Sequence, residues 1–309
     1  MSDLTIGSRG SRLSLWQAHY VRDRIVELDS SLTVTVISIT TRGDKDRKSP
    51  LPQIGDKGVF TAEIESALKN GEIDLAVHSL KDLPVVLESP FTLGAVPPRE
   101  SAMDVLVSSD GSSFDDLPPE AVIATGSVRR RAQLLHIRPD LRFVDIRGNI
   151  ETRLKKLKKE RWHGLIMAEA ALHRLELMDI PYSPLGLDVM VPAAGQGAVA
   201  VEVREDREDL KPILEGINNI YSFQEVETEL HFIALAEGGC KVPAGAYAEV
   251  NRGGIHLTGF VSSLDGKHLL RNTVSGPVQK RKDLAQKLFD TLTARGAQEI
   301  LASARGVLE

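Results

Sequence analysis

Short β-branched segments alternate with amphipathic helical segments from the start of the chain, and this alternation constrains the fold more than any other feature. The expected elements of the first block are a strand over residues 4–8, a helix over 13–29, a strand over 33–40, a helix over 61–70 and a strand over 75–78. Apolar residues three and four positions apart define one face of each helix, and Gly71 supplies a stop for the second helix. The pattern predicts βαβ units and hence an α/β layer structure.

A second alternating block follows the proline-rich stretch at residues 97–100, where we place a domain boundary or hinge. Its expected elements are a strand over residues 123–125, a helix over 128–136, a strand over 143–146, a helix over 150–159 and a strand over 165–168. Because 309 residues exceed the usual size of one hydrophobic core, we expect this block to form a second α/β lobe.

The last third of the chain has a different pattern. After a Gly195-Gln196-Gly197 turn, the expected elements are a helix over residues 223–237, strands over 245–250, 255–261 and 268–274, and a helix over 283–295. Strands grouped together and flanked by helices predict a small α+β domain.

Composition and charge narrow the function classes. The chain has 38 basic and 43 acidic residues, and this net charge of -5 argues against a protein that coats nucleic acid or an anionic membrane. No stretch approaches the roughly 20 apolar residues that a membrane-spanning helix needs. The single cysteine suits a reducing compartment, and the first apolar segment starts too close to Met1 for an export signal. We therefore expect a cytoplasmic protein.

Polar side chains occur where the strands of the first block end. They are residues 8–11, Asp44, the pair Lys57-Gly58 and residues 79–82. Such positions favour ligands, because loops and helix N-termini at the ends of parallel strands present N–H groups suited to anions. Two of these residues also have a structural interpretation that stays open here: Ser11 as a helix N-cap and Asp82 as a turn residue before Pro84.

The second block carries several arginines at expected strand ends. The set comprises Thr125-Gly126-Ser127, Arg129-Arg130-Arg131, Arg147-Gly148-Asn149 and Arg153. Guanidinium forks bind carboxylates in two-pronged geometry, so this set predicts a ligand with several carboxylates or phosphates. By contrast, the lysine run at residues 155–159 has no interleaved aromatic residue and predicts a solvated helix face.

Cys240 follows two glycines at the expected end of the long helix. Glycines permit close approach of another group, but the motif by itself favours a buried, inert cysteine, because a reactive thiol requires a stabilised thiolate.

Taken together, these segments resemble the porphobilinogen deaminase family, also called hydroxymethylbilane synthase, across essentially the whole chain. The resemblance rests on strings that appear in order: Gly7-Ser8-Arg9 with Leu15-Trp16-Gln17-Ala18, Thr41-Arg42-Gly43-Asp44, Lys57-Gly58-Val59-Phe60, AVHSLKDLP at residues 76–84, Arg147-Gly148-Asn149, Ala194-Gly195-Gln196-Gly197 and Glu237-Gly238-Gly239-Cys240.

The resemblance implies two lobes like those of periplasmic binding proteins, with doubly wound mixed sheets and an active site between them, followed by a small α+β C-terminal domain. The implied boundaries are residues 1–97 with 198–215 for the first lobe, 102–191 for the second and 219–309 for the C-terminal domain. A segment that returns after the second lobe would thus complete the first.

The resemblance also implies an activity and a cofactor. The expected enzyme is a transferase of porphyrin and haem biosynthesis that condenses four porphobilinogen molecules head to tail, with release of ammonia, to the linear tetrapyrrole hydroxymethylbilane. A dipyrromethane cofactor, joined to Cys240 by a thioether, is implied, and no metal or nucleotide is required. Porphobilinogen is the expected partner of a monomer that binds neither nucleic acid nor membrane.

Site residues follow from the same resemblance. Asp82 matches the family's catalytic aspartate, whose carboxylate can bind pyrrole N–H groups, stabilise positive charge and assist proton transfer. The residues implied to hold the cofactor are Cys240, Lys57, Ser79, Lys81, Asp82, Thr125, Ser127, Arg129, Arg130 and Asp44. Those implied to bind substrate are Arg9, Ser11, Phe60, Arg147, Arg153, Arg174 and Gln196. Gln53 stands where many family members have lysine, which would remove one cation beside the cofactor.

Two other classes of protein compete with this interpretation. A non-catalytic anion-binding module of the periplasmic-binding-protein type would explain the arginines, but it explains neither Cys240 after its glycines nor the lack of an export signal. A phosphate-transferring enzyme is weaker still, because the chain lacks the GxxxxGK[ST] loop.

Overall fold

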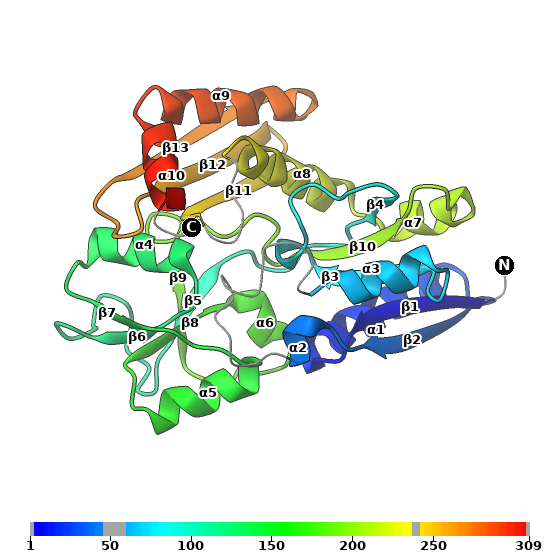
Figure 1. Cartoon of the computed structure of the whole chain (residues 1–309), viewed down its shortest axis with the longest axis horizontal. Coiled ribbons are helices and arrows are strands. Elements are labelled where there is room, and N and C mark those ends of the chain that lie inside the picture. The colour runs from blue at the N-terminus through cyan, green and yellow to red at the C-terminus, as the bar shows by residue number, and fades with distance from the viewer. Residues whose placement is uncertain (1–2, 46–59, 237–241, 307–309) are drawn as a thin grey trace. The chain divides into compact units, whose positions relative to one another are not determined.

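The computed structural model describes residues 3–45, 60–236 and 242–306 (Figure 1). The chain divides into two compact units, which we call the first unit (residues 1–100 and 197–223) and the second unit (residues 101–196 and 224–309). The first unit contains a five-stranded sheet, and the second contains a five-stranded and a three-stranded sheet. The chain therefore leaves the first unit, returns to it and ends in the second.

The sheet of the first unit has the strand order β2-β1-β3-β10-β4. Its strands are β1 (Asp3–Arg9), β2 (Thr33–Ile39), β3 (Leu75–Ser79), β4 (Phe91–Ala95) and β10 (Val199–Arg204). Strands β1, β2 and β3 are parallel, and β10 runs antiparallel to both of its neighbours. Helices α1 (Arg12–Leu28) and α7 (Lys211–Ile217) share one apolar cluster with the strands, and α3 (Ala62–Lys69) packs in another. The short elements are α2 (Arg42–Lys45), η2 (Leu80–Asp82) and η3 (Glu208–Leu210).

Local sequence explains where these helices begin and end. Ser11 caps α1, because its side chain accepts a 3.1 Å hydrogen bond from the backbone N–H of Ser14. The structural interpretation of Ser11 is thus confirmed. Ala18 and Ile25 on the apolar face of α1 are fully buried, whereas Leu28 at its end is 50% exposed. After α3, Gly71 adopts a φ of 72°, which a glycine accepts without strain.

The five-stranded sheet of the second unit repeats this topology, with the order β7-β6-β8-β5-β9. Its strands are β5 (Asp104–Val107), β6 (Val122–Ala124), β7 (Arg142–Val144), β8 (Gly164–Ala168) and β9 (Tyr182–Leu185). Strands β6, β7 and β8 are parallel, and β5 runs antiparallel to its neighbours. Helix α4 (Val128–Ile137) packs in one apolar cluster, and α5 (Ile150–Lys159) and α6 (Glu169–Arg174) pack in another. In each sheet, the antiparallel strand is the first one after the chain enters that unit from the other.

The C-terminal part of the second unit is an antiparallel sheet with helices against it (Figure 1). Its elements are β11 (Ala244–Asn251), β12 (Gly254–Ser262), β13 (Leu269–Gly276), η4 (Val278–Lys280), α9 (Arg281–Thr293), α10 (Ala297–Gly306) and α8 (Ile220–Leu235), whose first turn still belongs to the first unit. Phe232 of α8 and Leu288 of α9 both pack on Gly259 of β12, where a Cβ atom would lie 2.8 Å and 2.9 Å from them. The missing side chain lets both helices approach the sheet closely.

The expected α/β class with a small α+β C-terminal part is confirmed. The helix expected over residues 150–159 matches α5 at both ends, and Lys155, Lys158 and Lys159 on it are exposed as expected. Strands β4, β5, β9 and β10 were missed, because four to six residues give too little periodicity and β9 contains Pro184. The last residue of the helix expected over 223–237 lies outside the described residues. Across the described part of the chain, every helix is too short or too polar to span a bilayer.

We predict that Phe232→Ala lowers the free energy of unfolding by about 3–5 kcal/mol, because it empties a fully buried position between α8, α9 and β12. Urea denaturation followed by circular dichroism measures the change. Tyr221→Ala on the same helix is the matched control, since Tyr221 is 60% exposed and its loss should change stability by less than about 0.5 kcal/mol. Equal effects of the two substitutions would contradict the packing described here.

Candidate functional site

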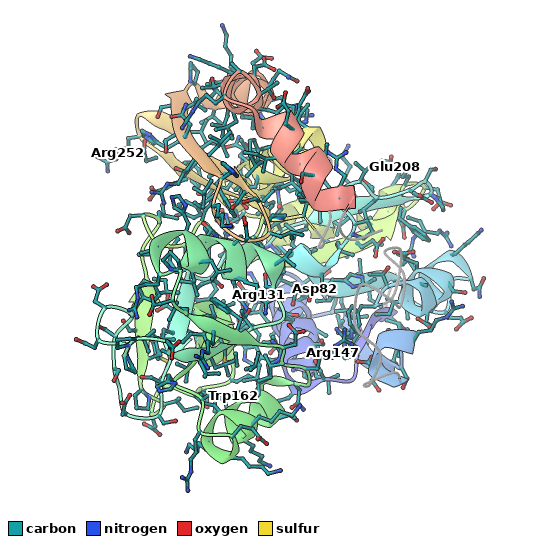
Figure 2. All side chains as sticks on the ribbon, turned by 60° about the vertical axis from the view of Figure 1, so that its left-hand side comes forward. Asp82, Arg131, Arg147, Trp162, Glu208 and Arg252 are labelled. Carbon is teal, nitrogen blue, oxygen red and sulfur yellow. The ribbon has the colours of Figure 1, made fainter. Side chains whose placement is uncertain are left out.

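Polar side chains follow each of the three parallel strands of the first unit. Arg9 is the last residue of β1, Asp44 lies in α2 after β2, and Ser79 is the last residue of β3. The turn η2 then carries Lys81 and Asp82 (Figure 2). Because the carboxyl ends of parallel strands lie at one edge of a sheet, these groups belong to the same edge.

Arg9, Asp44 and Phe60 form one cluster at this edge. The Nε of Arg9 donates to Oδ2 of Asp44 at 3.3 Å and its Nη2 donates to Oδ1, while the guanidinium carbon lies 4.1 Å from the centroid of the Phe60 ring. The hydroxyl of Thr41 also donates to Asp44, at 2.8 Å. Burial raises the pKa of Asp44, but the hydrogen bonds from Arg9 and Thr41 outweigh it and hold the pKa below its ordinary value. Asp44 is therefore an anion paired with Arg9 at neutral pH.

Ser79 and Asp82 have different surroundings. The side chain of Gln17, buried in α1, donates a 2.9 Å hydrogen bond to Oγ of Ser79. Asp82 is exposed, at the end of a turn that is closed by a 3.0 Å hydrogen bond from the N–H of Leu83 to the carbonyl of Leu80. The interpretation of Asp82 as a turn residue is confirmed. A turn that exposes a carboxylate at a strand end also presents it to a ligand.

The second unit has a matching edge at the carboxyl ends of β6, β7 and β8. Ser127 caps α4, which follows β6, and Asn149 caps α5, which follows β7, through a 2.9 Å hydrogen bond from the N–H of Thr152. Arg147 lies in the loop before α5 (Figure 2), and Nε of Arg153 donates to the carbonyl of Gly148 at 2.8 Å. Two ten-residue helices therefore begin at this edge, and helix N-termini favour anions.

A buried ion cluster around Asp104 is the tightest polar feature of the second unit. Arg129 donates to one oxygen of Asp104 through Nη2 at 2.8 Å, and Arg130 donates to the other through Nη2 at 2.6 Å and Nε at 3.1 Å. Gln196 donates to the same carboxylate at 2.9 Å. The arginines also donate to backbone carbonyls, Arg129 to Val191 and Arg130 to Ile166.

The charge state of this cluster follows from its burial and its hydrogen bonds. Burial raises the pKa of Asp104, but the charges of Arg129 and Arg130 and the hydrogen bonds from Arg130 and Gln196 hold it well below its ordinary value. One anion therefore faces two cations, and the cluster keeps a single net positive charge.

The sequence prediction did not include Asp104. It is the first residue of β5, and the antiparallel pairing places it beside Ala168, the last residue of β8. Asp104 lies at the polar edge only because β5 runs antiparallel to β8, and no local sequence pattern indicated that direction. The signal that could have found it is the acidic residue that opens the apolar run of residues 105–107.

The structure brings the predicted residues together in several groups. Arg9, Asp44 and Phe60 form one group, and Arg129, Arg130 and Gln196 form another around Asp104. Thr125 and Ser127 are joined by a 3.2 Å hydrogen bond from the N–H of Ser127 to the Thr125 hydroxyl. Arg174 is buried at the end of α6. Lys57, Cys240 and Gln53 lie outside the described residues.

Within the described residues, no group of three or more histidine, cysteine, aspartate or glutamate side chains could hold a metal ion. The polar edges instead combine arginines, hydroxyl groups and helix N-termini, with exposed carboxylates at Asp82 after β3 and at Asp145 after β7. Fold and site thus define an α/β protein whose strands carry, at their carboxyl ends, groups suited to anionic ligands.

Comparison with known proteins gives the family. Residues 4–212 match the family described as "Porphobilinogen deaminase, dipyromethane cofactor binding domain", and residues 223–294 match "Porphobilinogen deaminase, C-terminal domain". A porphobilinogen deaminase from Syntrophotalea carbinolica is 44% identical over 98% of this chain and 96% of its own length. One from Lawsonia intracellularis is 40% identical over the full length of both chains. The chain belongs to the porphobilinogen deaminase family, and this membership does not favour the non-catalytic anion-binding module.

Solved structures with detectable similarity include periplasmic binding proteins. A TRAP periplasmic solute binding protein from Desulfovibrio salexigens has a TM-score of 0.43 at 11% identity and covers 70% of this chain and 72% of its own. An arginine 3rd transport system periplasmic binding protein from Legionella pneumophila has a TM-score of 0.38 at 18% identity, with 71% and 91% covered.

We predict that Asp104→Asn lowers the free energy of unfolding by about 3–5 kcal/mol at neutral pH, because it leaves two buried arginines without their anion. The pKa of Asp104 is lowered by folding, so its stabilisation is complete above the unfolded pKa of about 3.9 and is lost as the pH falls through the folded value. The gap between wild type and variant should therefore be constant above about pH 5 and narrow in acid.

Chemical denaturation across a pH series measures this gap. Asp140→Asn is the matched control, since Asp140 pairs with Arg138 near the surface and should contribute much less. A gap that widened in acid, or equal losses in the two variants, would contradict the assigned role of Asp104.

Proposed function

We propose that this chain condenses four porphobilinogen molecules head to tail, with release of ammonia, to the linear tetrapyrrole hydroxymethylbilane. The observation that carries the proposal is the family match over both parts of the chain, residues 4–212 and 223–294. The geometry supports it, because the AVHSLKDLP string that carries Asp82 forms the end of β3 and an exposed turn at the polar edge of its sheet.

Asp82 is the proposed catalytic residue. Loss of ammonia from porphobilinogen leaves an electrophilic methylene group and positive charge on the pyrrole ring. A carboxylate beside that ring accepts a hydrogen bond from the pyrrole N–H and stabilises the positive charge. It also transfers protons during deamination and ring joining. An exposed aspartate at a strand end suits this role, because among the described residues no salt bridge neutralises the charge of Asp82.

The arginines and hydroxyl groups are the proposed binding groups for carboxylates. Each porphobilinogen ring carries an acetate and a propionate, so a growing chain accumulates negative charge that needs permanent cations. In the first unit these would be Arg9 and Lys81, with Ser11, Ser79, Phe60 and Asp44 around them. In the second unit they would be Arg129, Arg130, Arg147, Arg153 and Arg174, with Thr125, Ser127 and Gln196.

The pairing of several of these cations refines the proposal. Arg9 lies against Asp44, and Arg129 and Arg130 lie against Asp104. These guanidinium groups are held in place by their carboxylates, and a ligand carboxylate would bind the N–H groups that remain. Such preorganised donors lose little freedom when the ligand binds.

The donor set also fits a dipyrromethane cofactor, which carries acetate and propionate groups and two pyrrole N–H groups. Thr125, Ser127, Arg129 and Arg130 would hold the carboxylates at the start of α4, and Ser79 and Lys81 would contribute from β3 and η2. Asp44, Lys57 and Asp82 complete the proposed set. When bound, the cofactor would supply the free α-carbon to which the first substrate ring is joined. We propose that a thioether links it to Cys240, which lies within the C-terminal match.

A cytoplasmic monomer completes the proposal. The single cysteine suits a reducing compartment, and the net charge of -5 gives no reason to expect nucleic acid or anionic membrane as a partner.

We predict that the mass of the intact active protein exceeds that of the polypeptide by a covalent adduct of two pyrrole units. Intact-protein mass spectrometry measures it, and addition of porphobilinogen should give further stepwise increments. Cys240→Ser is the control and should show the bare polypeptide mass, because it removes the only thiol. An unmodified mass in active wild-type protein would exclude the thioether.

We predict that Asp82→Ala and Asp82→Asn each lower kcat by at least about 100-fold, because one carboxylate stabilises charge and moves protons. Stopped assays of porphobilinogen consumption measure kcat, and circular dichroism checks the fold. Asp23→Ala replaces another exposed aspartate of the first unit and should leave kcat unchanged. Activity of the Asp82 variants within a few-fold of wild type would remove this residue from catalysis.

A further inference from the structure

The end of β3 depends on β10 for its position. Strand β1 pairs with β3 at Leu75 and Ala76, whereas β10 pairs with β3 from Ala76 to Ser79. The N–H of Leu80 extends this pairing with a 3.1 Å hydrogen bond to the carbonyl of Ala198. The residues that lead into the Asp82 turn are therefore held mainly by a strand that lies far away in sequence.

A buried pair of side chains joins these two strands. Nε2 of His78 on β3 lies 3.0 Å from Oε2 of Glu202 on β10, and both residues are buried. Glu202 is the register partner of Ala76, two residues from His78, so the two side chains form a diagonal cross-strand pair. The alternation of side chains along β3 places His78 on the same face as Ala76, which packs with α3.

A contribution to the stability of the fold does not explain the His78–Glu202 pair well. Oε1 of Glu202 is buried and has no hydrogen-bond partner among the residues that the structure describes. Burying a polar atom without a partner costs free energy, and two apolar side chains of similar volume would stabilise a buried site at least as well. What the directional hydrogen bond adds to the backbone ladder and the apolar packing is a contact that forms only when His78 and Glu202 lie in this one alignment of the two strands.

We infer that His78 and Glu202 are positioning residues for Asp82. Their hydrogen bond fixes β3 against β10 at the last strand residues, so that Ser79 and the turn of Leu80, Lys81 and Asp82 leave the sheet in one geometry. Neither residue touches the substrate in this inference. The expected effect on kcat rests on the proposed function, whereas the expected effect on the geometry of the turn does not.

Three variants and two measurements test the inference. In His78→Leu and Glu202→Leu the hydrogen bond is lost, and in Glu202→Gln an amide keeps an oxygen that can accept from the imidazole. Hydrogen exchange of the peptide spanning residues 79–86 follows the turn directly, since it contains the N–H groups of Leu80 and Leu83. Steady-state kinetics with porphobilinogen separates kcat from KM.

We expect both leucine variants to exchange the 79–86 peptide at least about tenfold faster and to lose about 10- to 100-fold in kcat, since a misplaced catalytic group costs rate. KM should rise only a few-fold, because Lys81 is the single proposed carboxylate-binding cation that lies in this turn. Glu202→Gln should retain the slow exchange and most of kcat.

Val203→Ala is the matched control. Val203 is buried on β10 but pairs with Thr92 of β4, beyond the segment that pairs with β3. It should lower the melting temperature without changing exchange of the 79–86 peptide or kcat. Leucine variants that behave like Val203→Ala, or a Glu202→Gln variant as impaired as Glu202→Leu, would overturn the inference. Wild-type protein that does not consume porphobilinogen would instead refute the proposed function, and the exchange data would still decide the role of the pair.

Discussion

The ion cluster of Asp104, Arg129 and Arg130 is the interaction on which the polar edge of the second unit depends. Two guanidinium groups so close together repel each other, and burial makes this repulsion stronger because the surroundings screen it less than water does. One carboxylate between them removes most of that cost, and the carbonyls of Val191 and Ile166 satisfy further donors. The two guanidinium groups are thus held in place by hydrogen bonds, and the cluster has a net charge of +1.

In the first unit, a single arginine is held by a carboxylate in the same way. Arg9 is held by Asp44 on one side and lies over the Phe60 ring, so its guanidinium has a fixed orientation before any ligand arrives. Asp82 is the contrast, because it is exposed and ends a short turn. Paired cations at strand ends suit the binding of carboxylates, and an exposed anion suits the stabilisation of positive charge in a reaction. This division of roles is the physical basis of the proposed activity.

In both five-stranded sheets, the antiparallel strand begins at the polar edge, where the parallel strands end. Strand β5 begins with Asp104 next to the end of β8, and β10 begins at Val199, the register partner of Ser79. In each case the chain has just entered the unit from the other one. The first strand after each crossing therefore contributes a side chain to the unit it enters. Strand β5 supplies Asp104 as the counter-ion of two arginines, and β10 supplies Glu202 as the partner of His78.

The sequence by itself determined many of the local elements and most of the candidate residues. The bounds of α5, the cap at Ser11 and the stop at Gly71 follow from side-chain spacing and backbone preferences within a few residues, and motif strings marked Asp82, Cys240 and the arginines. Tertiary structure alone decided the partners: that Arg129 and Arg130 share Asp104, that Arg9 pairs with Asp44, and that His78 meets Glu202. These contacts join residues 25 to 124 positions apart through strand direction and register. Short strands such as β5 carry too little local pattern to reveal either property, so no periodicity in the sequence could have shown them.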